Sequence, residues 1–238
     1  MIETIKKVYN NQCSKHAYKK LIKKSILAGM FISIGAIFSI MVKPYGNLVQ
    51  GLCFSIGLVG VLVCEAKLFT GSILQVSNLW NDRDSLSSVI SDWVFIFIGN
   101  SIGVIFIGLL SIGLNLDNNV VTSICQNKAN TQPLEFFIRS ILCNILVCFA
   151  VFSYRISFDI KKDILHAMAS CILPVACFVA CGFEHSIADL YYMLIGLFQG
   201  STDIIHFWYV LNFSVFGNII GGIIFTWFIY EDKKHITF

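Results

Sequence analysis

The chain has 238 residues, of which 56% are hydrophobic and only 13% are charged, and its mean hydropathy is +0.76. This composition is typical of an integral membrane protein and excludes an ordinary soluble domain. The net charge of +3 does not indicate a nucleic-acid partner. The nine cysteines include no CxxC pair and lie mostly in apolar segments, so we expect no disulfide framework, no metal centre and no cofactor.

The first 24 residues are polar and rich in lysine, and we expect no signal peptide there. Two interpretations of this segment, residues 1–24, are open. It forms an amphipathic helix on the inner membrane surface, with Ile2, Ile5, Val8 and Tyr9 on one side, or it is a solvated basic leader that only fixes the topology.

Six apolar stretches follow in chain order, and each is long enough to cross a bilayer. They lie at residues 25–42, 47–80, 88–114, 134–154, 164–198 and 208–230. The predicted fold is therefore an all-α membrane protein with six transmembrane helices, of which helices two and five are broken by short polar stretches. Residues 115–131 are polar and are predicted to form an outer loop, and residues 159–163 a charged inner turn.

Lysine and arginine decide the orientation, because loops rich in these residues stay in the cytoplasm. With the N-terminus inside, the cytoplasmic side holds Lys6, Lys7, Lys15, Lys19, Lys20, Lys23, Lys24, Arg83, Arg155, Lys161, Lys162, Lys233 and Lys234. The outer side holds only Lys43, Lys128 and Arg139. We therefore expect both termini in the cytoplasm, a channel domain at residues 25–230 in the plasma membrane and a cytoplasmic tail at 231–238.

The two polar interruptions look like partners. They read Lys67-Leu68-Phe69-Thr70-Gly71-Ser72 and Gly182-Phe183-Glu184-His185-Ser186. Backbone that leaves the helix inside a bilayer loses its hydrogen bonds unless it lines a cavity or packs against protein. A matched pair of broken helices therefore indicates a transport site near the membrane midplane.

The chain also repeats itself weakly. The run Ile98-Gly99-Asn100-Ser101-Ile102-Gly103 resembles Phe216-Gly217-Asn218-Ile219-Ile220-Gly221. Ser72 and Ser186, which close the two interruptions, are separated by a similar offset. We therefore expect two halves, about 25–114 and 134–230, that are inverted relative to each other because each has an odd number of spans. The glycines allow close helix packing, and Asn100 and Asn218 are assigned a structural polar role.

His185 is the strongest candidate for a functional side chain, because an ionisable residue at the depth of a helix break is rarely without a role. Histidine also changes its charge near neutral pH. A neutral His185 that ties the two breaks together through Thr70 is compatible with a pore position. For Glu184 we expect a structural role, with its carboxylate accepting N–H groups that the break exposes. Asp189 lies one helical turn beyond His185, within reach of the same region.

The surrounding sequence is apolar and includes Phe54, Leu58, Leu68, Phe69, Phe178 and Phe183. Such side chains usually serve packing, but near a pore they form constrictions that exclude water and ions. A bare anion would stall at these constrictions, whereas its neutral acid would pass.

These residues resemble the formate–nitrite transporter family over nearly the whole chain. The resemblance is carried by residues 173–188, which read LPVACFVACGFEHSIA, by Leu68-Phe69-Thr70-Gly71 and by the GNIIGG run at residues 217–222. It implies an aquaporin-like bundle of six helices, assembled as a homopentamer in the lipid bilayer with one pore per protomer. It also implies passage of small monovalent anions or their conjugate acids, namely formate, nitrite, acetate, lactate or hydrosulfide.

The resemblance also implies roles for individual residues. His185 is similar to the central pore histidine, and Thr70 to its partner. The constriction positions are matched by Phe54, Leu58, Leu68, Phe69, Phe178 and Ala188. Lys128 is similar to an outer-vestibule lysine that attracts anions, and Lys20 to an inner-vestibule lysine.

Two positions depart from the family pattern, and both change the electrostatics of the pore. Lys67 stands where an acidic residue is usual, with Glu65 two residues earlier, and Asp189 stands where asparagine is common. Lys67 is either an additional anion attractor or one member of a structural ion pair with Glu65 or Glu184.

Three other functions compete with a proton-linked anion pore. A neutral-solute channel of the aquaporin type would favour paired Asn-Pro-Ala motifs, which the sequence lacks. An intramembrane enzyme could use Asp189 and His185 as an acid–base pair, but no nucleophile motif or metal-ligand spacing accompanies them. A structural membrane subunit would not need the polar interruptions. We therefore expect a channel and not an enzyme.

Overall fold

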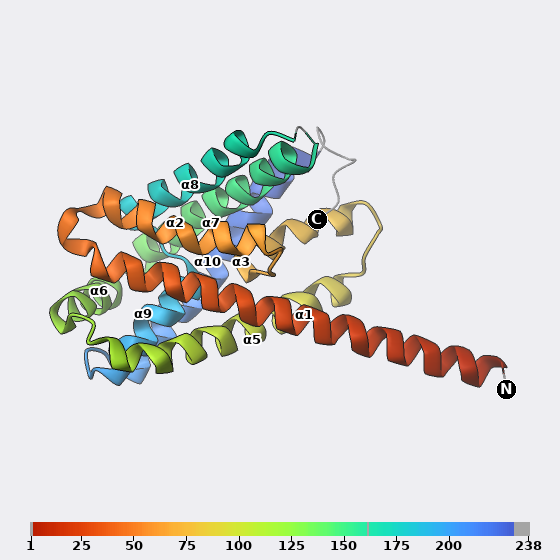
Figure 1. The fold of residues 1–238 in the computed structure, drawn as a ribbon, viewed down its shortest axis with the longest axis horizontal. Coiled ribbons are helices and arrows are strands. Elements are labelled where there is room, and N and C mark those ends of the chain that lie inside the picture. Colours follow the sequence, from red (N-terminus) through yellow and green to blue (C-terminus); the bar gives the residue numbers. More distant parts are fainter. Residues whose placement is uncertain (1, 161, 231–238) are drawn as a thin grey trace.

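The computed structural model describes the backbone of residues 2–160 and 162–230 and the side chains of residues 17–158 and 162–230. The predicted tail at residues 231–238 lies outside this range, as do the side chains of Ile2, Ile5, Val8 and Tyr9. Every regular element in the described part of the chain is helical, as predicted. The long helices form one bundle, and α1 extends well beyond it at the end where α10 also terminates (Figure 1).

The first half begins with α1 (Ile2–Met41), which is one continuous helix across the expected boundary at residue 24. A short link, η1 (Lys43–Tyr45), leads through Gly46 at φ 101° to α2 (Asn47–Val63). The chain then leaves the helix at Cys64–Leu68, where Glu65 has φ 48°. This stretch is followed by the short helices α3 (Phe69–Ser72), η2 (Ile73–Gln75) and α4 (Val76–Trp80), then by α5 (Leu86–Ser111) and η3 (Ile112–Leu114).

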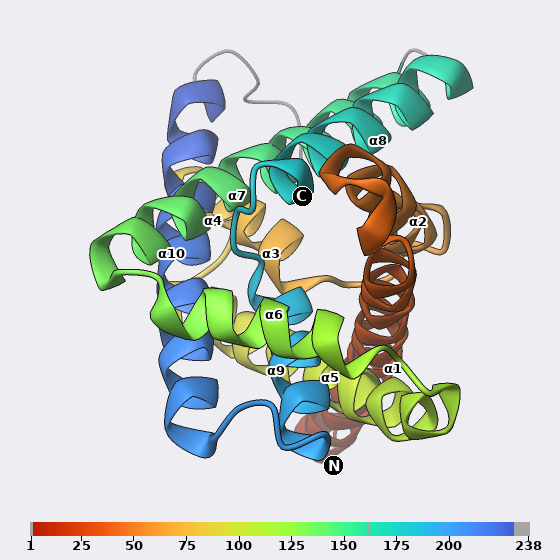
Figure 2. The ribbon, with the colours of Figure 1, turned by 90° about the vertical axis from the view of Figure 1, so that its left-hand side faces the viewer.

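The second half follows the same order. It contains α7 (Pro133–Arg155), η4 (Ile156–Ile160), α8 (Ile164–Ala180), α9 (Ser186–Phe198) and α10 (Ile204–Tyr230). The interruption between α8 and α9 passes through Gly182 at φ 68° and ends at His185. Viewed along the bundle, α3 and α9 lie toward the middle, surrounded by the longer helices (Figure 2).

The prediction that residues 115–131 form a loop is wrong, because this segment contains the helix α6 (Asn118–Asn130). Asp117 caps this helix by accepting a hydrogen bond from the backbone N–H of Asn119 at 2.8 Å. Val121 and Cys125, four residues apart, form a buried stripe that packs toward α9. The low mean hydropathy of the segment concealed this stripe. In Figure 2, α6 crosses one end of the bundle.

Among the described residues, four helical stretches are long and apolar enough to cross a membrane. They are Ala17–Met41, Leu86–Leu114, Pro133–Phe158 and Ile204–Tyr230. The predicted second and fifth spans consist of shorter helices, so the count of six spans stays a prediction.

Small residues bring the helices of each half into contact at equivalent places. A Cβ atom on Gly103 of α5 would lie 2.1 Å from the carbonyl oxygen of Ile26 on α1. A Cβ atom on Gly221 of α10 would lie 2.2 Å from the carbonyl oxygen of Ile141 on α7. Only glycine permits this backbone approach, which lets the paired helices hold the interrupted segments between them.

Candidate functional site

Asn100 on α5 secures the first interruption from inside the bundle. Its side-chain oxygen accepts a hydrogen bond from the backbone N–H of Phe69 at 2.8 Å. Its side-chain nitrogen donates to the carbonyl oxygen of Lys67 at 2.9 Å and to that of Ser25 at 2.7 Å. The exposed backbone groups on both sides of Leu68 are thereby satisfied without water.

Asn218 on α10 makes the equivalent three contacts in the second half. Its oxygen accepts from the backbone N–H of Ser186 at 2.8 Å, and its nitrogen donates to the carbonyl oxygens of Glu184 at 2.9 Å and Ser140 at 2.8 Å. The prediction that the Glu184 carboxylate accepts the backbone N–H groups freed by the break is therefore wrong. The amide freed by the break bonds to Asn218, which is fully buried beside it, and the carboxylate turns to a lysine instead.

His185 occupies the junction of the two interruptions, with only 2% of the residue exposed. It is the N-cap of α9, since its Nδ1 accepts the backbone N–H of Ala188 at 3.2 Å. Its Nε2 lies 3.0 Å from Oγ1 of Thr70, the predicted partner from the first interruption. Because Nδ1 accepts, the neutral ring carries its proton on Nε2 and donates it to Thr70.

A cavity of about 180 Å³ lies beside His185, and its lining includes Asn127 and Lys128 of α6. Phe54, Phe178 and Ala188, three of the predicted constriction residues, line it together with His185. The ring of Phe178 stacks on His185 with centroids 5.9 Å apart, and it meets Phe54 edge to face at the same separation. We call this space the outer cavity.

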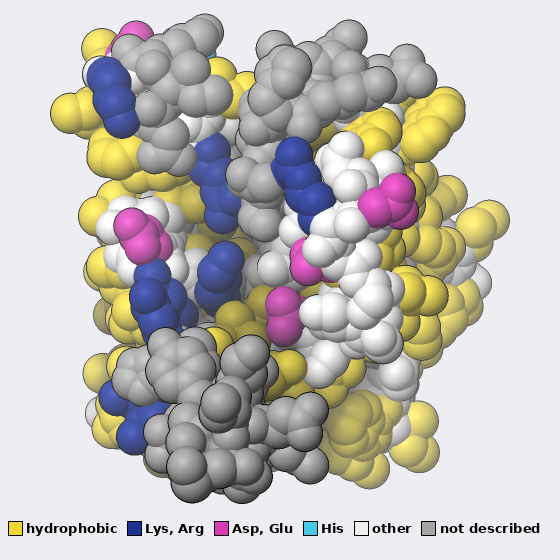
Figure 3. Space-filling model, turned by 90° about the vertical axis from the view of Figure 1, so that its right-hand side faces the viewer, with side chains coloured by type: hydrophobic (Ala, Val, Ile, Leu, Met, Phe, Trp, Pro, Cys, Tyr) yellow, Lys and Arg dark blue, Asp and Glu magenta, His cyan; other side chains and the backbone are white. Residues whose placement is uncertain are grey.

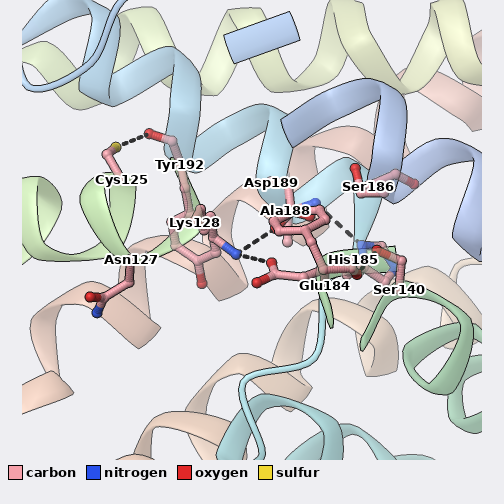
Figure 4. Close-up of polar contacts among 12 residues, drawn as sticks. Cys125, Asn127, Lys128, Ser140, Glu184, His185, Ser186, Ala188, Asp189 and Tyr192 are labelled. Atoms are coloured by element: carbon pink, nitrogen blue, oxygen red, sulfur yellow. Dashed lines mark hydrogen bonds and ion pairs between the residues drawn. The ribbon is translucent and has the colours of Figure 1, made fainter. Parts of the chain in front are cut away.

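Lys128 reaches into the outer cavity from α6 and lies between two carboxylates (Figure 4). It forms ion pairs with Glu184 and with Oδ1 of Asp189, the latter at 2.8 Å, and lies over the ring of Tyr192 at 5.5 Å. Burial lowers the pKa of Lys128, but the charges of Asp189 and Glu184 outweigh this effect and raise it above its usual value. Lys128 is therefore charged and paired with two carboxylates, and its expected role in attracting anions stays a prediction.

Lys43 and Arg139 are the other cations of the outer cavity. Lys43 donates to the side-chain oxygens of Asn47 at 3.2 Å and Gln50 at 3.0 Å, while Arg139 pairs with Glu135. Partial burial and the charge of Lys128 lower the pKa of Lys43. In the sequence analysis these two residues served only to assign the topology. Their place on the outer side could have indicated that they line the same cavity as Lys128.

A larger cavity, of about 830 Å³, lies at the opposite end of the bundle, and we call it the inner cavity. Its lining includes Lys20, Lys24, Lys67, Arg155 and Glu65. Figure 3 shows that Lys and Arg side chains gather on this end of the molecule. Two predicted anion-attracting residues, Lys20 and Lys67, therefore line one space.

Neither acidic residue that the sequence offered as a partner for Lys67 pairs with it. Glu65 pairs with Lys24 at 2.8 Å, and Glu184 pairs with Lys128 at the other end of the bundle. Within the described residues, no ion pair joins Lys67 to an acidic side chain, so the interpretation of a structural ion pair is not supported.

A third cavity, of about 40 Å³, adjoins the inner cavity through the shared lining residues Lys67 and Arg155 and reaches Leu68. Leu58 and Phe69, the other predicted constriction residues, are buried and line none of these three cavities. Phe69 instead packs edge to face on Phe97 at 5.2 Å. Among the predicted constriction residues, Leu68 is thus the one that lines the small cavity adjoining the inner cavity.

The arrangement separates two cavities by a buried and largely apolar layer, and His185 contacts Thr70 within this layer. Cations outnumber carboxylates in the lining of each cavity, whereas Phe54, Phe178 and Leu68 bound the layer between them. A bare charge in such a layer would lose its hydration without gaining a counter-charge, but a small neutral molecule would not.

Comparison with known proteins places this arrangement in a family. A family model described as "Formate/nitrite transporter" matches residues 1–231. The formate channel FocA of Escherichia coli (strain K12) is 31% identical in an alignment that covers 94% of this chain and 91% of that protein. The family model is described as a transporter and FocA is named as a channel, which confirms the expectation that the chain is not an enzyme.

The two solved structures match nearly the whole chain. One, described as a pentameric formate channel with formate bound, is 26% identical, has a TM-score of 0.77 and is matched over 92% of this chain and 98% of its own. The other, described as an FNT family ion channel, is 22% identical with a TM-score of 0.82 over 98% of this chain and 99% of its own. With the family model spanning both interruptions and the cavities on either side of them, the chain is an integral membrane protein that belongs to the formate/nitrite transporter family.

Proposed function

We propose that the chain is a passive channel for formate and similar small monovalent anions, which enter as anions and cross the apolar layer as conjugate acids. The observation that carries this proposal is the pair of cation-lined cavities separated by Phe54, Phe178 and Leu68. Cations raise the local concentration of an anion, and the apolar layer admits only a species without net charge.

Formate is the substrate we favour. FocA, at 31% identity, is named as a formate channel, and the solved structure with a TM-score of 0.77 is described with formate bound. Nitrite, acetate, lactate and hydrosulfide carry the same charge and are the other substrates to be compared. Lys20 and Lys67 would attract the anion on the inner side, and His185 with Thr70 would form the centre of the path.

The proposed architecture is a homopentamer of six-span protomers in the plasma membrane, with one pore per protomer. The neighbour described as a pentameric channel supports the assembly. The equivalent contacts of Asn100 and Asn218 support two inverted halves, about 25–114 and 134–230. Helix α1 begins, and α10 terminates, at the lysine-rich end of the bundle (Figures 1 and 3). This arrangement supports a cytoplasmic location for the N-terminal segment, residues 1–24, and for the tail at residues 231–238, which lies outside the described range.

The test is uptake of labelled formate, nitrite, acetate, lactate and hydrosulfide by proteoliposomes at several external pH values. We expect formate uptake to rise as the external pH falls, because a proton accompanies each anion. A pH-independent current carried by the anion would contradict passage as the neutral acid. Uptake of uncharged solutes alone would favour a channel of the aquaporin type.

A further inference from the structure

The inner cavity is much larger than the small anions that the channel is proposed to conduct. Its volume is about 830 Å³, whereas a water molecule takes up about 30 Å³ in the liquid. Sites for organic ligands of drug size measure roughly 300–1,000 Å³. The cavity that adjoins it on the side of Leu68 measures only about 40 Å³. A ligand that fills the inner cavity therefore cannot move on toward Leu68.

Positive charge exceeds negative charge in the lining of the inner cavity. Among the described residues that line it, four are cationic and one, Glu65, is acidic. Glu65 pairs with Lys24 at 2.8 Å, so the three other cations gain no counter-charge from the lining. A single formate ion balances only part of this charge. An anion with two or more negative charges is the better match.

The repulsion between these cations is greatest around Lys67. The charges of Arg155 and Lys24 both act against its ammonium group. The attraction exerted by Asp92 and Glu65 is weaker and offsets this repulsion only in part. Lys67 and Arg155 line both the inner cavity and the small cavity beyond it, so they lie where the two spaces meet. A phosphate group placed there would relieve the repulsion and offer several acceptor oxygens to both side chains.

The rest of the lining is apolar and includes a pair of aromatic rings. Tyr154 and Phe158 stack with their centroids 5.5 Å apart and an angle of 11° between the rings. Phe158 is 41% exposed, so part of its ring is accessible from the cavity. Val61, Leu62 and Met168 line the same space. Planar bases stack favourably on aromatic side chains of this kind.

We propose that the inner cavity binds a nucleoside phosphate, which closes the channel from the inside. The phosphate lies at Lys67 and Arg155, and the base lies against Phe158. The ligand does not cross, because it exceeds the small cavity in size and a multiply charged group cannot enter the apolar layer. The binding site is independent of the proposed function, whereas the closure rests on it.

Equilibrium dialysis of the purified protein with labelled adenosine 5′-monophosphate tests the site without transport. We expect saturable binding that weakens as the salt concentration rises. Adenosine has the same base without the charge, and inorganic phosphate has the charge without the base. Each should bind roughly tenfold more weakly than the nucleotide, because each lacks one of the two sets of contacts.

Two variants at exposed positions separate the contacts. Phe158→Leu keeps an apolar side chain but removes the ring, and it should weaken nucleotide binding roughly fivefold while leaving phosphate binding unchanged. Phe228→Leu, at an exposed position on α10 outside the cavity, is its control. Lys20→Met should weaken binding of the nucleotide and of phosphate roughly two- to thirtyfold. Lys23→Met, also exposed on α1 but not in the lining, is the control for charge.

Formate uptake by proteoliposomes tests the closure. The nucleotide is supplied on both sides of the membrane, so that it reaches the inner cavity in either orientation of the protein. At a nucleotide concentration of about ten times its Kd, uptake should fall roughly tenfold, since about one channel in eleven remains unoccupied. Adenosine at the same concentration should have no effect. Phe158→Leu should take up formate like the parent protein and require more nucleotide for the same inhibition.

Two results would overturn the site: nucleotide binding no tighter than that of adenosine or phosphate, or equal nucleotide binding in the parent, Phe158→Leu and Lys20→Met. Unchanged formate uptake at a saturating nucleotide concentration would overturn the closure. A parent protein that takes up no formate under any condition would overturn the proposed function instead, and dialysis would still decide whether the site exists.

Discussion

At the scale of single residues, His185 joins the two interrupted segments through both of its ring nitrogens. One nitrogen caps α9, and the other bonds to Thr70 of α3, 115 residues away in the sequence. The ring also stacks on Phe178 in the wall of the outer cavity. The same side chain therefore holds the local structure and borders the proposed path, so a test of its role must separate folding from transport.

Replacing His185 with phenylalanine should abolish formate uptake at equal membrane abundance, because a larger apolar ring would close the space beside Phe178. Loss of the cap on α9 should also cost about 1 kcal/mol of stability. Proteoliposome uptake and thermal unfolding measure the two effects separately. His166→Phe is the matched control, since His166 is exposed near the start of α8. Unchanged uptake in His185→Phe would place His185 outside the path.

Replacing Lys67 with methionine should raise the half-saturating anion concentration for transport from the inner side. A cation about 8 Å from an anion contributes roughly 0.5 kcal/mol in water and roughly 2 kcal/mol at an effective dielectric constant near 20, which corresponds to a roughly two- to thirtyfold change. Thermal stability should not fall, because no ion pair to an acidic residue is lost. Lys23→Met, at an exposed position of α1, is the control. A loss of stability with an unchanged concentration dependence would instead support a structural ion pair.

At the scale of the elements, the interruptions stay ordered because a helix of the same half supplies an asparagine to each. Asn100 and Asn218 each accept one backbone N–H and donate to two carbonyl groups. Close approaches at Gly103 and Gly221 bring these helices near enough to do so. The interruptions are thus rigid parts of the bundle, which suits a site that must exclude water and ions.

Asn218→Ala should lower the free energy of unfolding by roughly 2–4 kcal/mol, because it leaves the Ser186 N–H and the Glu184 carbonyl group buried without partners. Thermal unfolding in detergent gives the measurement. Asn212→Ala, an exposed position on the same helix, should change stability little. Equal stability of the two variants would mean that water replaces the lost contacts and that Asn218 does not secure the interruption.

At the scale of the whole molecule, the outer surfaces of the long helices are strongly apolar. Exposed large side chains on α5 include Val94, Ile98, Ile102, Ile105 and Leu109, and on α10 they include Trp208, Phe216, Trp227 and Phe228. In a membrane these faces contact either lipid or another protomer. Charged residues, in contrast, line the cavities at the two ends of the bundle.

We expect the protein to purify in mild detergent as a pentamer, as the solved neighbour described as a pentameric formate channel suggests. Native mass spectrometry should show five copies of the 26.7 kDa chain. Only monomers or dimers across several gentle detergents would contradict this assembly.

The sequence by itself determined the class of protein, the two interrupted segments and the pairing of His185 with Thr70. Apolar length and the position of a polar stretch can be read from neighbouring residues, whereas the pairing of His185 with Thr70, 115 residues apart, followed from the matched interruptions and the family resemblance. The prediction of an outer loop failed at α6 because its buried stripe of Val121 and Cys125 is short and diluted by polar residues.

Only the tertiary structure decided which charges meet. Lys128 pairs with Glu184 and Asp189, which follow it by 56 and 61 residues, and Glu65 pairs with Lys24, 41 residues before it. Such contacts depend on how α6 lies across the end of the bundle, and hydropathy carries no information about that. Packing therefore paired Lys128, the predicted anion attractor of the outer side, with two carboxylates, and left Lys67 without an ion pair to either acidic residue that the sequence suggested as its partner.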